Sequence, residues 1–350
     1  MKLGYFTLTD NPPAYGASRQ DPNELIKNTL TESIYAEELG YHSVWVPEHH
    51  LGVFGVLPSP SMFLSYVAAV TKRVELAPAT VLLPVNNPLR MAEEYALLNL
   101  MSDGRAIFSA GRGYDEREYE LFGVDFHKSR EIFFEQLDVI RKAWTQKVFD
   151  HKGEFYQYEN VELVPHVGEK APDIYVASFS RPSVEKAAAD GFNCIFAPFA
   201  AAMVFGDLNA AVKAFNDLSS QHGHQGKKVK CSYFINIADN QADIEAGAQR
   251  MLKYFKGILP AFPADPDKAP PSIRYFVDIV HRLENMQTTD LSEKSILNGS
   301  PEQIVEWLKN VEASGLDEVI LYFNFGGQDH KRTMQQMEWA AREILPHFHN

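Results

Sequence analysis

Residues 74–104, VELAPATVLLPVNNPLRMAEEYALLNLMSDG, contain one complete strand–helix unit and decide the fold. The apolar run VELAPATVLL (74–83) is typical of a buried strand. The segment PLRMAEEYALLNLMSDG (88–104) begins with Pro, repeats apolar residues every three or four positions and reaches Gly104, as an amphipathic helix does. A strand followed by such a helix is the building block of a parallel sheet, so the number of copies along the chain sets the architecture.

The same alternation recurs along the whole chain. Short apolar runs predict strands at 3–8, 43–46, 74–83, 106–111, 173–179, 193–199, 230–238 and 318–327. Helical patterns follow them at 24–40, from Pro60, at 88–104, 130–144, 181–191, around 206–222, around 241–256, and at the C-terminus. A doubly wound open sheet is the alternative, but no GxGxxG sequence follows the first strand. We therefore predict an α/β fold, a (β/α)8 TIM barrel formed by residues 1–350 as a single domain.

The chain is longer than a minimal barrel requires. Eight minimal units need about 250 residues, whereas the chain has 350. We expect the surplus in rim insertions at 112–128, 150–171 and 257–296. The last of these is rich in proline and charge, which predicts a mobile excursion.

Composition narrows the class of function. The formal net charge is −13, which disfavours binding to nucleic acid or to anionic membranes. The two cysteines, Cys194 and Cys231, lie in apolar runs without metal-ligand spacing, so we predict no metal site and no disulfide. The N-terminus turns polar before a signal-length apolar core forms, and no apolar run could span a bilayer. We expect a soluble, cytoplasmic protein.

Polar residues follow four of the predicted strands. EHH (48–50) follows the second strand, GRG (111–113) the fourth, SFSRPS (178–183) includes the end of the fifth, and Gly326–Gly327 ends the eighth. The C-terminal ends of barrel strands share one rim, where barrel enzymes place their active sites. We therefore expect these segments to converge.

EHH places three titratable side chains side by side. Because side chains alternate along an extended chain, Glu48 and His50 share one side and His49 takes the other. Three consecutive residues are geometrically poor ligands for one metal ion. One histidine facing the cavity is suited to act as acid, base or hydrogen-bond donor. The alternative is a carboxylate–imidazole network of Glu48 and His50 that closes the barrel end.

Three segments could bind phosphate. Arg112 offers a planar guanidinium to an anion, although it could instead pair with Asp115 or Glu116. Ser180 and Ser183 lie at a helix start, where free N–H groups favour an anion, or where a serine simply caps the helix. Gly326–Gly327 is the third segment, and barrels often hold phosphate after the seventh and eighth strands.

EHHLGVFGVLP, APATVLLPVNNPLRMAEEYALLNLMSDGR and GRGYDEREYELFGVDFHKSR resemble the corresponding segments of bacterial luciferase and of the wider luciferase-like flavin monooxygenase family. The resemblance runs from MKLGYF to GSPEQIVEWLKNVEASGLDEVIL, nearly the whole chain. It implies a barrel that binds reduced FMN (FMNH2) and reacts it with O2. The resulting C4a-peroxyflavin would oxygenate a small organic substrate.

The resemblance also assigns residues. His49 matches the histidine proposed as catalytic acid or base, while Glu48 and His50 would orient it or seal the barrel. Candidate cofactor-binding residues are the phosphate-binding Arg112, Arg130, Ser180 and Ser183, together with Ala79–Thr80, which matches a non-proline cis peptide beneath the flavin. This assignment displaces Gly326–Gly327.

Two cofactor-site positions depart from luciferase. Gly111 replaces a reactive cysteine near the flavin, which implies more room beside the ring. Phe179 replaces a glutamate before the phosphate serine. Both departures argue against light emission and a long-chain aldehyde substrate.

The expected activity is therefore that of a two-component monooxygenase, supplied with FMNH2 by a separate flavin reductase. An F420-dependent oxidoreductase of the same superfamily and a non-catalytic FMN-binding flavoprotein are the alternatives. The apolar helices at 60–70 and 88–101 match the region through which luciferase-like proteins pair, which predicts a homodimer.

Overall fold

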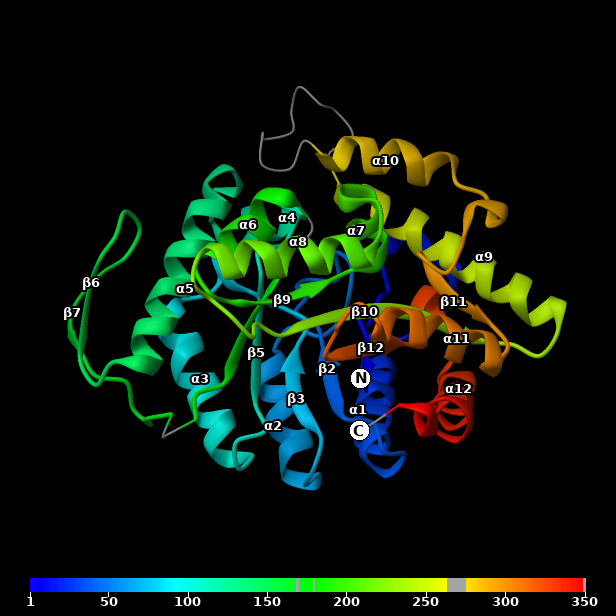
Figure 1. Ribbon diagram of the computed structural model, residues 1–350, viewed down its shortest axis with the longest axis horizontal. Coiled ribbons are helices and arrows are strands. Elements are labelled where there is room, and N and C mark those ends of the chain that lie inside the picture. The colour runs from blue at the N-terminus through cyan, green and yellow to red at the C-terminus, as the bar shows by residue number, and fades with distance from the viewer. Residues whose placement is uncertain (168–169, 179, 263–274, 349–350) are drawn as a thin grey trace.

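Eight parallel strands form a barrel in the computed structural model, which describes residues 1–167, 170–178, 180–262 and 275–348 (Figure 1). Each strand pairs with the next along the chain, and β1 also pairs with β12. The strands are β1 (Lys2–Phe6), β2 (Ser43–Val46), β3 with β4 (Glu75–Pro78 and Val81–Leu82), β5 (Ile107–Gly111), β8 (Asp173–Ala177), β9 (Asn193–Phe196), β10 (Val229–Ile237) and β12 (Glu318–Tyr322). The predicted TIM barrel is confirmed.

The third barrel strand is interrupted, and the interruption lies at the rim. β3 pairs with β2, whereas β4 pairs with β5, so the two pieces together link the neighbouring strands. A parallel bridge between Leu76 and Ala106 completes the ring, and the Leu76 N–H donates to the Arg105 carbonyl at 2.9 Å. The residues between the two pieces, Ala79 and Thr80, are joined by a cis peptide bond.

Helices surround the barrel (Figure 1). The predicted helices are confirmed as α1 (Pro22–Glu38), α2 (Pro60–Val70), α3 (Pro88–Met101), α5 (Ser129–Thr145), α6 (Arg181–Ala189), α8 (Leu208–Gln221), α9 (Gln241–Ile258) and α12 (His330–Glu343). Four further α-helices among the described residues were not predicted: α4 (Glu116–Phe122), α7 (Pro198–Phe205), α10 (Tyr275–Asn285) and α11 (Pro301–Glu312). Among the described residues, no helix combines the length and apolar character needed to cross a membrane.

Local sequence explains the unit that decides the fold. Three of the four residues of β3 and both residues of β4 are buried, as expected for a parallel strand covered on both faces. α3 begins with Pro88 in its first turn, and the Asn87 side chain accepts hydrogen bonds from the N–H groups of Leu89 and Arg90 at 3.0 and 3.1 Å. These contacts satisfy donors that have no partner inside the helix.

The predicted insertions contain ordered elements. Segment 112–128 carries α4 (Glu116–Phe122), and segment 150–171 completes a hairpin of β6 (Phe149–Lys152) and β7 (Gln157–Val161) that projects beside α5 (Figure 1). Segment 257–296 includes α10, which lies over the barrel end near α7 and α9 (Figure 1), and reaches β11 (Ile296–Gly299), an unpredicted strand on β10. Residues 263–274 lie outside the described residues, so the mobility of this insertion stays a prediction.

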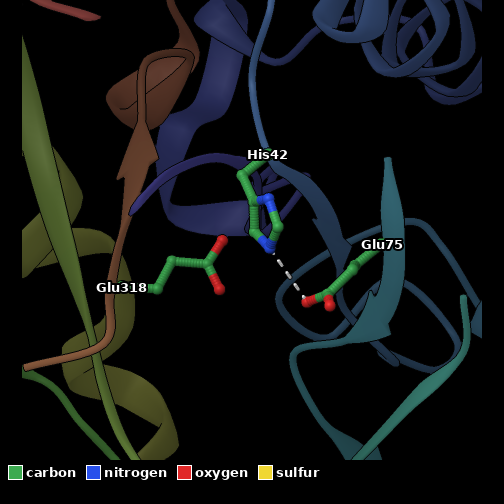
Figure 2. A group of neighbouring side chains, drawn as sticks. All are labelled: His42, Glu75 and Glu318. Atoms are coloured by element: carbon green, nitrogen blue, oxygen red, sulfur yellow. Dashed lines mark ion pairs between the residues drawn. The ribbon is translucent and has the colours of Figure 1, made fainter. Parts of the chain in front are cut away.

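Buried and half-buried charged side chains cluster at the N-terminal ends of the barrel strands. His42 Nε2 lies 3.3 Å from Glu75 Oε2, and Glu318 completes a group whose possible ligand atoms lie within 4.8 Å of one another (Figure 2). Lys230 pairs with Glu318 and approaches Glu75 at 3.7 Å. Burial raises the pKa of Glu75, but His42 and Lys230 lower it to about 2. Because one ammonium serves both carboxylates, we assign this cluster to an internal ion-pair network.

Candidate active site

A cavity of about 260 Å³ lies at the C-terminal ends of the barrel strands. Residues of the segments after β2, β5 and β8 reach it, which confirms the predicted convergence for these three segments. Gly326 and Gly327, which follow β12, are not among the lining residues. The candidate residues that line the cavity are Glu48, His49, Ala79, Thr80, Gly111, Arg112, Arg130 and Ser183. The cavity lining does not include His50 and Ser180, and Phe179 lies outside the described residues.

Glu48 connects the end of β2 to β4 through hydrogen bonds. Its buried carboxylate accepts hydrogen bonds from the Leu82 N–H at 2.9 Å and from Asn86 Nδ2 at 2.8 Å. His50 Nε2 lies 2.9 Å from the same carboxylate, and the His50 ring packs edge-on against Phe122. The predicted pairing of Glu48 with His50 is confirmed, and these contacts are those of a network that closes the barrel end.

His49 takes the other side of the chain and lines the cavity. Its ring packs edge-on against Phe54, with centroids 4.7 Å apart. The Nδ1 atom lies 3.9 Å from Glu118 Oε1, whereas the buried Nε2 atom has no hydrogen-bond partner among the described residues. An unpaired buried polar atom costs about 1–3 kcal/mol. A ligand that fills the cavity could supply the missing partner.

Glu118 is a site residue that the sequence did not indicate. It belongs to α4 in the insertion after β5, is buried, and accepts a hydrogen bond from the His50 N–H at 2.9 Å. Burial raises the pKa of Glu118, but His49 and His50 lower it more, so the pKa lies below its ordinary value. The carboxylate is therefore ionised near neutral pH and favours a proton on His49 Nδ1.

The Ala79–Thr80 cis peptide that the resemblance implied is present. Thr80 also changes the interpretation of Gly111. A Cβ atom placed on Gly111 would overlap the Thr80 hydroxyl. The space left by the missing side chain is therefore occupied by Thr80, and the prediction of additional room at this position is wrong.

Cationic and hydroxyl groups gather at one side of the cavity. Arg112 and Arg130 both line it, and Arg130 Nη2 lies 3.4 Å from the Pro182 carbonyl in the first turn of α6. Ser180 occupies the N-cap position of α6 without capping it, and its Oγ lies 3.0 Å from Ser183 Oγ. Simple N-capping by Ser180 is thus contradicted. Guanidinium groups, hydroxyls and a helix N-terminus form a suitable anion-binding end.

At the rim after β12, the backbone already binds the carboxylate of Asp10. The Gly326 N–H donates to Asp10 Oδ2 at 3.0 Å, and the phenols of Tyr15 and Tyr322 also donate to this carboxylate. Asp10 is buried, and burial raises its pKa to about 6 although these three donors lower it. This explains why Gly326 is poorly placed to bind phosphate, as its N–H is already engaged.

A barrel rim that combines an anion-binding end, an apolar chamber and a buried imidazole has the features of a cofactor-dependent barrel enzyme. The family model described as luciferase-like monooxygenase matches residues 1–318, and the chain belongs to this family. The resemblance found in the sequence is confirmed.

Individual relatives share the chain length but differ in their cofactors. The oxygenase component of the flavin-dependent trigonelline monooxygenase of Acinetobacter baylyi is 24% identical, covering 95% of this chain and 92% of the relative. The oxygenating constituent of 3,6-diketocamphane monooxygenase of Pseudomonas putida, solved with FMN, aligns with a TM-score of 0.72, 18% identity and coverage of 100% and 99%. An F420-dependent secondary alcohol dehydrogenase aligns with a TM-score of 0.75 and 14% identity, covering 100% of this chain and 99% of the dehydrogenase.

Asp10 provides a test of the rim electrostatics. An unfolded aspartate has a pKa near 3.9, whereas the folded value is about 6. The protonated form is thus favoured by folding, so this stabilisation is present at low pH and is lost as the pH rises through about 6. Between about pH 4 and pH 7 the free energy of unfolding of the wild type should fall by about 2 kcal/mol relative to Asp10→Asn. Urea unfolding at both pH values measures this, and a pH-independent difference would contradict it.

Proposed function

We propose that this protein is the oxygenase component of a two-component monooxygenase that uses FMNH2 and O2 to oxygenate a small organic substrate. The observation that carries the proposal is the placement of His49. His49 lines the same cavity as Arg112, Arg130 and Ser183, and its buried Nε2 atom has no hydrogen-bond partner among the described residues. A flavin mononucleotide, with a phosphate at one end and a ring at the other, matches this combination of side chains.

The residues present fit that cofactor. Arg112, Arg130, Ser180 and Ser183 would hold its phosphate, because their side chains and the α6 N-terminus offer donors at one end of the cavity. Bound FMNH2 would supply the electrons that activate oxygen. His49 would hold or transfer a proton at Nε2, with Glu118 favouring the tautomer that carries hydrogen on Nδ1. The apolar walls would exclude water from the reacting atoms.

A separate flavin reductase is the partner that this function requires. The sequence has no visible NAD(P)H-binding fingerprint. The trigonelline enzyme is named an oxygenase component, which supports the same division of labour here. Small-molecule substrate and O2 would enter this chain, whereas the reductant would arrive as FMNH2.

An F420-dependent oxidoreductase is the main alternative, because a solved structure of that kind shares the fold. Anaerobic titration of the protein with FMNH2 and with reduced F420 distinguishes the two. The proposal requires tighter binding of FMNH2. Preferential binding of reduced F420 would support the alternative, and tight FMN binding without any turnover would support a flavin-sequestering protein.

The proposed dimer rests on an apolar face of α2 and α3. Met62, Tyr66 and Val70 on α2 are 76%, 58% and 51% exposed, and Leu100 and Met101 on α3 are 61% and 51% exposed. Burial of such side chains is favourable by about 25 cal/mol per Å². We expect a homodimer with twofold symmetry in sedimentation at micromolar concentration. The double variant Met62→Glu/Leu100→Glu should sediment as a monomer, whereas a monomeric wild type would contradict the proposed interface.

Arg112 provides the test of phosphate binding. Arg112→Ala should weaken FMN far more than riboflavin, because only FMN carries the phosphate that loses a charge-assisted hydrogen bond. The expected loss for FMN is about tenfold or more, from the roughly 1.5–3 kcal/mol of such a bond. Fluorescence titration with both ligands measures it. Equal losses for FMN and riboflavin would show that Arg112 does not hold the phosphate.

His49 and His50 should separate chemistry from scaffolding. His49→Ala should leave FMNH2 affinity within a few-fold and lower product formation by about 10²–10⁴, the usual contribution of a positioned acid or base. His50→Ala removes a partner of the buried Glu48 carboxylate, so it should cost about 1–3 kcal/mol of stability. Thermal melting and turnover per flavin-loaded molecule measure both effects. The opposite outcome, a silent His49→Ala and an inactive His50→Ala, would reverse the assignment.

A further inference from the structure

A continuous series of aromatic rings leads from His49 across the cavity. The His49 ring contacts Phe54 edge-on at a centroid distance of 4.7 Å, and Phe54 meets Tyr254 at 6.0 Å with an interplanar angle of 81°. Tyr254 in turn packs against Phe234 at 4.8 Å and 60°. All four rings line the cavity.

Phe234 is the centre of this series. Its ring lies 5.2 Å from that of Tyr322 and 6.5 Å from that of Phe255, which also line the cavity. We call the set Phe54, Phe234, Tyr254, Phe255 and Tyr322 the aromatic wall. Its members come from four separate places in the chain: the loop after β2, and β10, α9 and β12. The fold therefore assembles the wall at the site, and no single sequence motif contains it.

The aromatic wall is preorganised. Each ring packs against at least one other ring of the wall, and the Tyr322 hydroxyl donates to the buried Asp10 carboxylate. Rings held in this way offer edges and faces without a cost for ordering them. A rigid planar ligand gains from such surfaces, since a favourable aromatic pair adds about 0.5–1.5 kcal/mol beyond the area that it buries. A flexible chain must lose rotational freedom to bind the same wall.

The described elements that carry most of the aromatic wall contribute no charged residue to the cavity lining. In the part of the chain that the structure describes, the charged lining residues of the cavity are Glu48, Arg112 and Arg130. The lining residues that β10, α9, α10 and β12 contribute are neutral there. An ionised group on a ligand against the aromatic wall would lose hydration without gaining an opposite charge, which is costly.

We infer that the substrate to be oxygenated is a neutral aromatic ring compound, bound against the aromatic wall with its reacting atom beside His49. The inference rests on the proposed function, in which FMNH2 supplies two electrons and two hydrogens. One atom of O2 enters the substrate, the other leaves as water, and FMNH2 becomes FMN. The aromatic wall then decides which compounds reach the reacting atoms, as a specificity-determining surface.

Three probes with equal numbers of carbon atoms test the inference: 2-naphthaldehyde, undecanal and 2-naphthoate. Calorimetry on FMN-loaded protein should show that 2-naphthaldehyde binds at least about tenfold more tightly than the other two. Apolar area alone would favour undecanal, which exposes more hydrocarbon, so the expected order does not follow from hydrophobicity. Undecanal or 2-naphthoate binding as tightly as 2-naphthaldehyde would overturn the inference.

A matched pair of variants locates the effect. Phe234→Leu removes the central ring of the aromatic wall and should weaken 2-naphthaldehyde by about two- to tenfold while leaving undecanal within twofold. Phe215→Leu makes the same exchange in the buried core of α8, away from the cavity, and should change neither affinity. Equal weakening of both probes by Phe234→Leu, or an effect of Phe215→Leu as large, would overturn the assignment to the wall.

FMN binding is measured separately, from the visible absorbance of the loaded protein. If FMN binds and the order of the probes is reversed, the substrate inference fails and the proposed cofactor stands. If FMN does not bind, the proposed function fails. The probes can then be titrated into the flavin-free protein, and a retained preference for 2-naphthaldehyde identifies the aromatic wall as a ring-binding surface independent of the cofactor.

Discussion

Parallel pairing of all eight strands in one closed ring is the constraint on which the site depends. Because every strand runs the same way, the residues that follow each strand must meet at a single rim. His49, Arg112 and Ser183 are widely separated in the sequence but line one cavity for this reason. The N-terminal end of the barrel is filled instead by the buried ion pair of Lys230 and Glu318. The candidate site, which a ligand must be able to reach, therefore lies at the C-terminal rim.

Because side chains alternate along an extended chain, the three consecutive residues 48–50 have different roles. Glu48 and His50 turn to one side, where His50 contacts the Glu48 carboxylate and this carboxylate joins the end of β2 to β4 by accepting a hydrogen bond from the Leu82 N–H. His49 turns to the other side, where its ring lies against Phe54 and near Glu118 and lines the cavity, and its Nε2 atom has no partner among the described residues. A buried carboxylate network is costly unless every partner is present. Here the Glu48 network fixes the end of β2, which also carries His49. One short segment therefore supplies both a structural network and a residue of the candidate site.

The sequence predicted the features that depend on periodicity and on order along the chain. Eight strands and most helices followed from local patterns, and the Glu48–His50 pairing followed from strand alternation. α7 was missed because PFAAAMVF is apolar throughout and has no helical period, whereas α11 carries a capping box at Ser300 that could have revealed it. Glu118, the space filled by Thr80 and the aromatic wall depend on contacts between distant segments, which no local pattern encodes.

We propose that this chain protects the reaction of FMNH2 with oxygen inside the cavity. The most direct measurement mixes FMNH2-loaded protein with oxygenated buffer and follows flavin absorbance together with the release of hydrogen peroxide. We expect two phases, in which FMNH2 disappears rapidly and oxidised FMN and peroxide appear much later, because the apolar cavity excludes water. A single phase, with peroxide released as fast as FMNH2 is consumed and as in free solution, would show that the cavity does not protect the reaction.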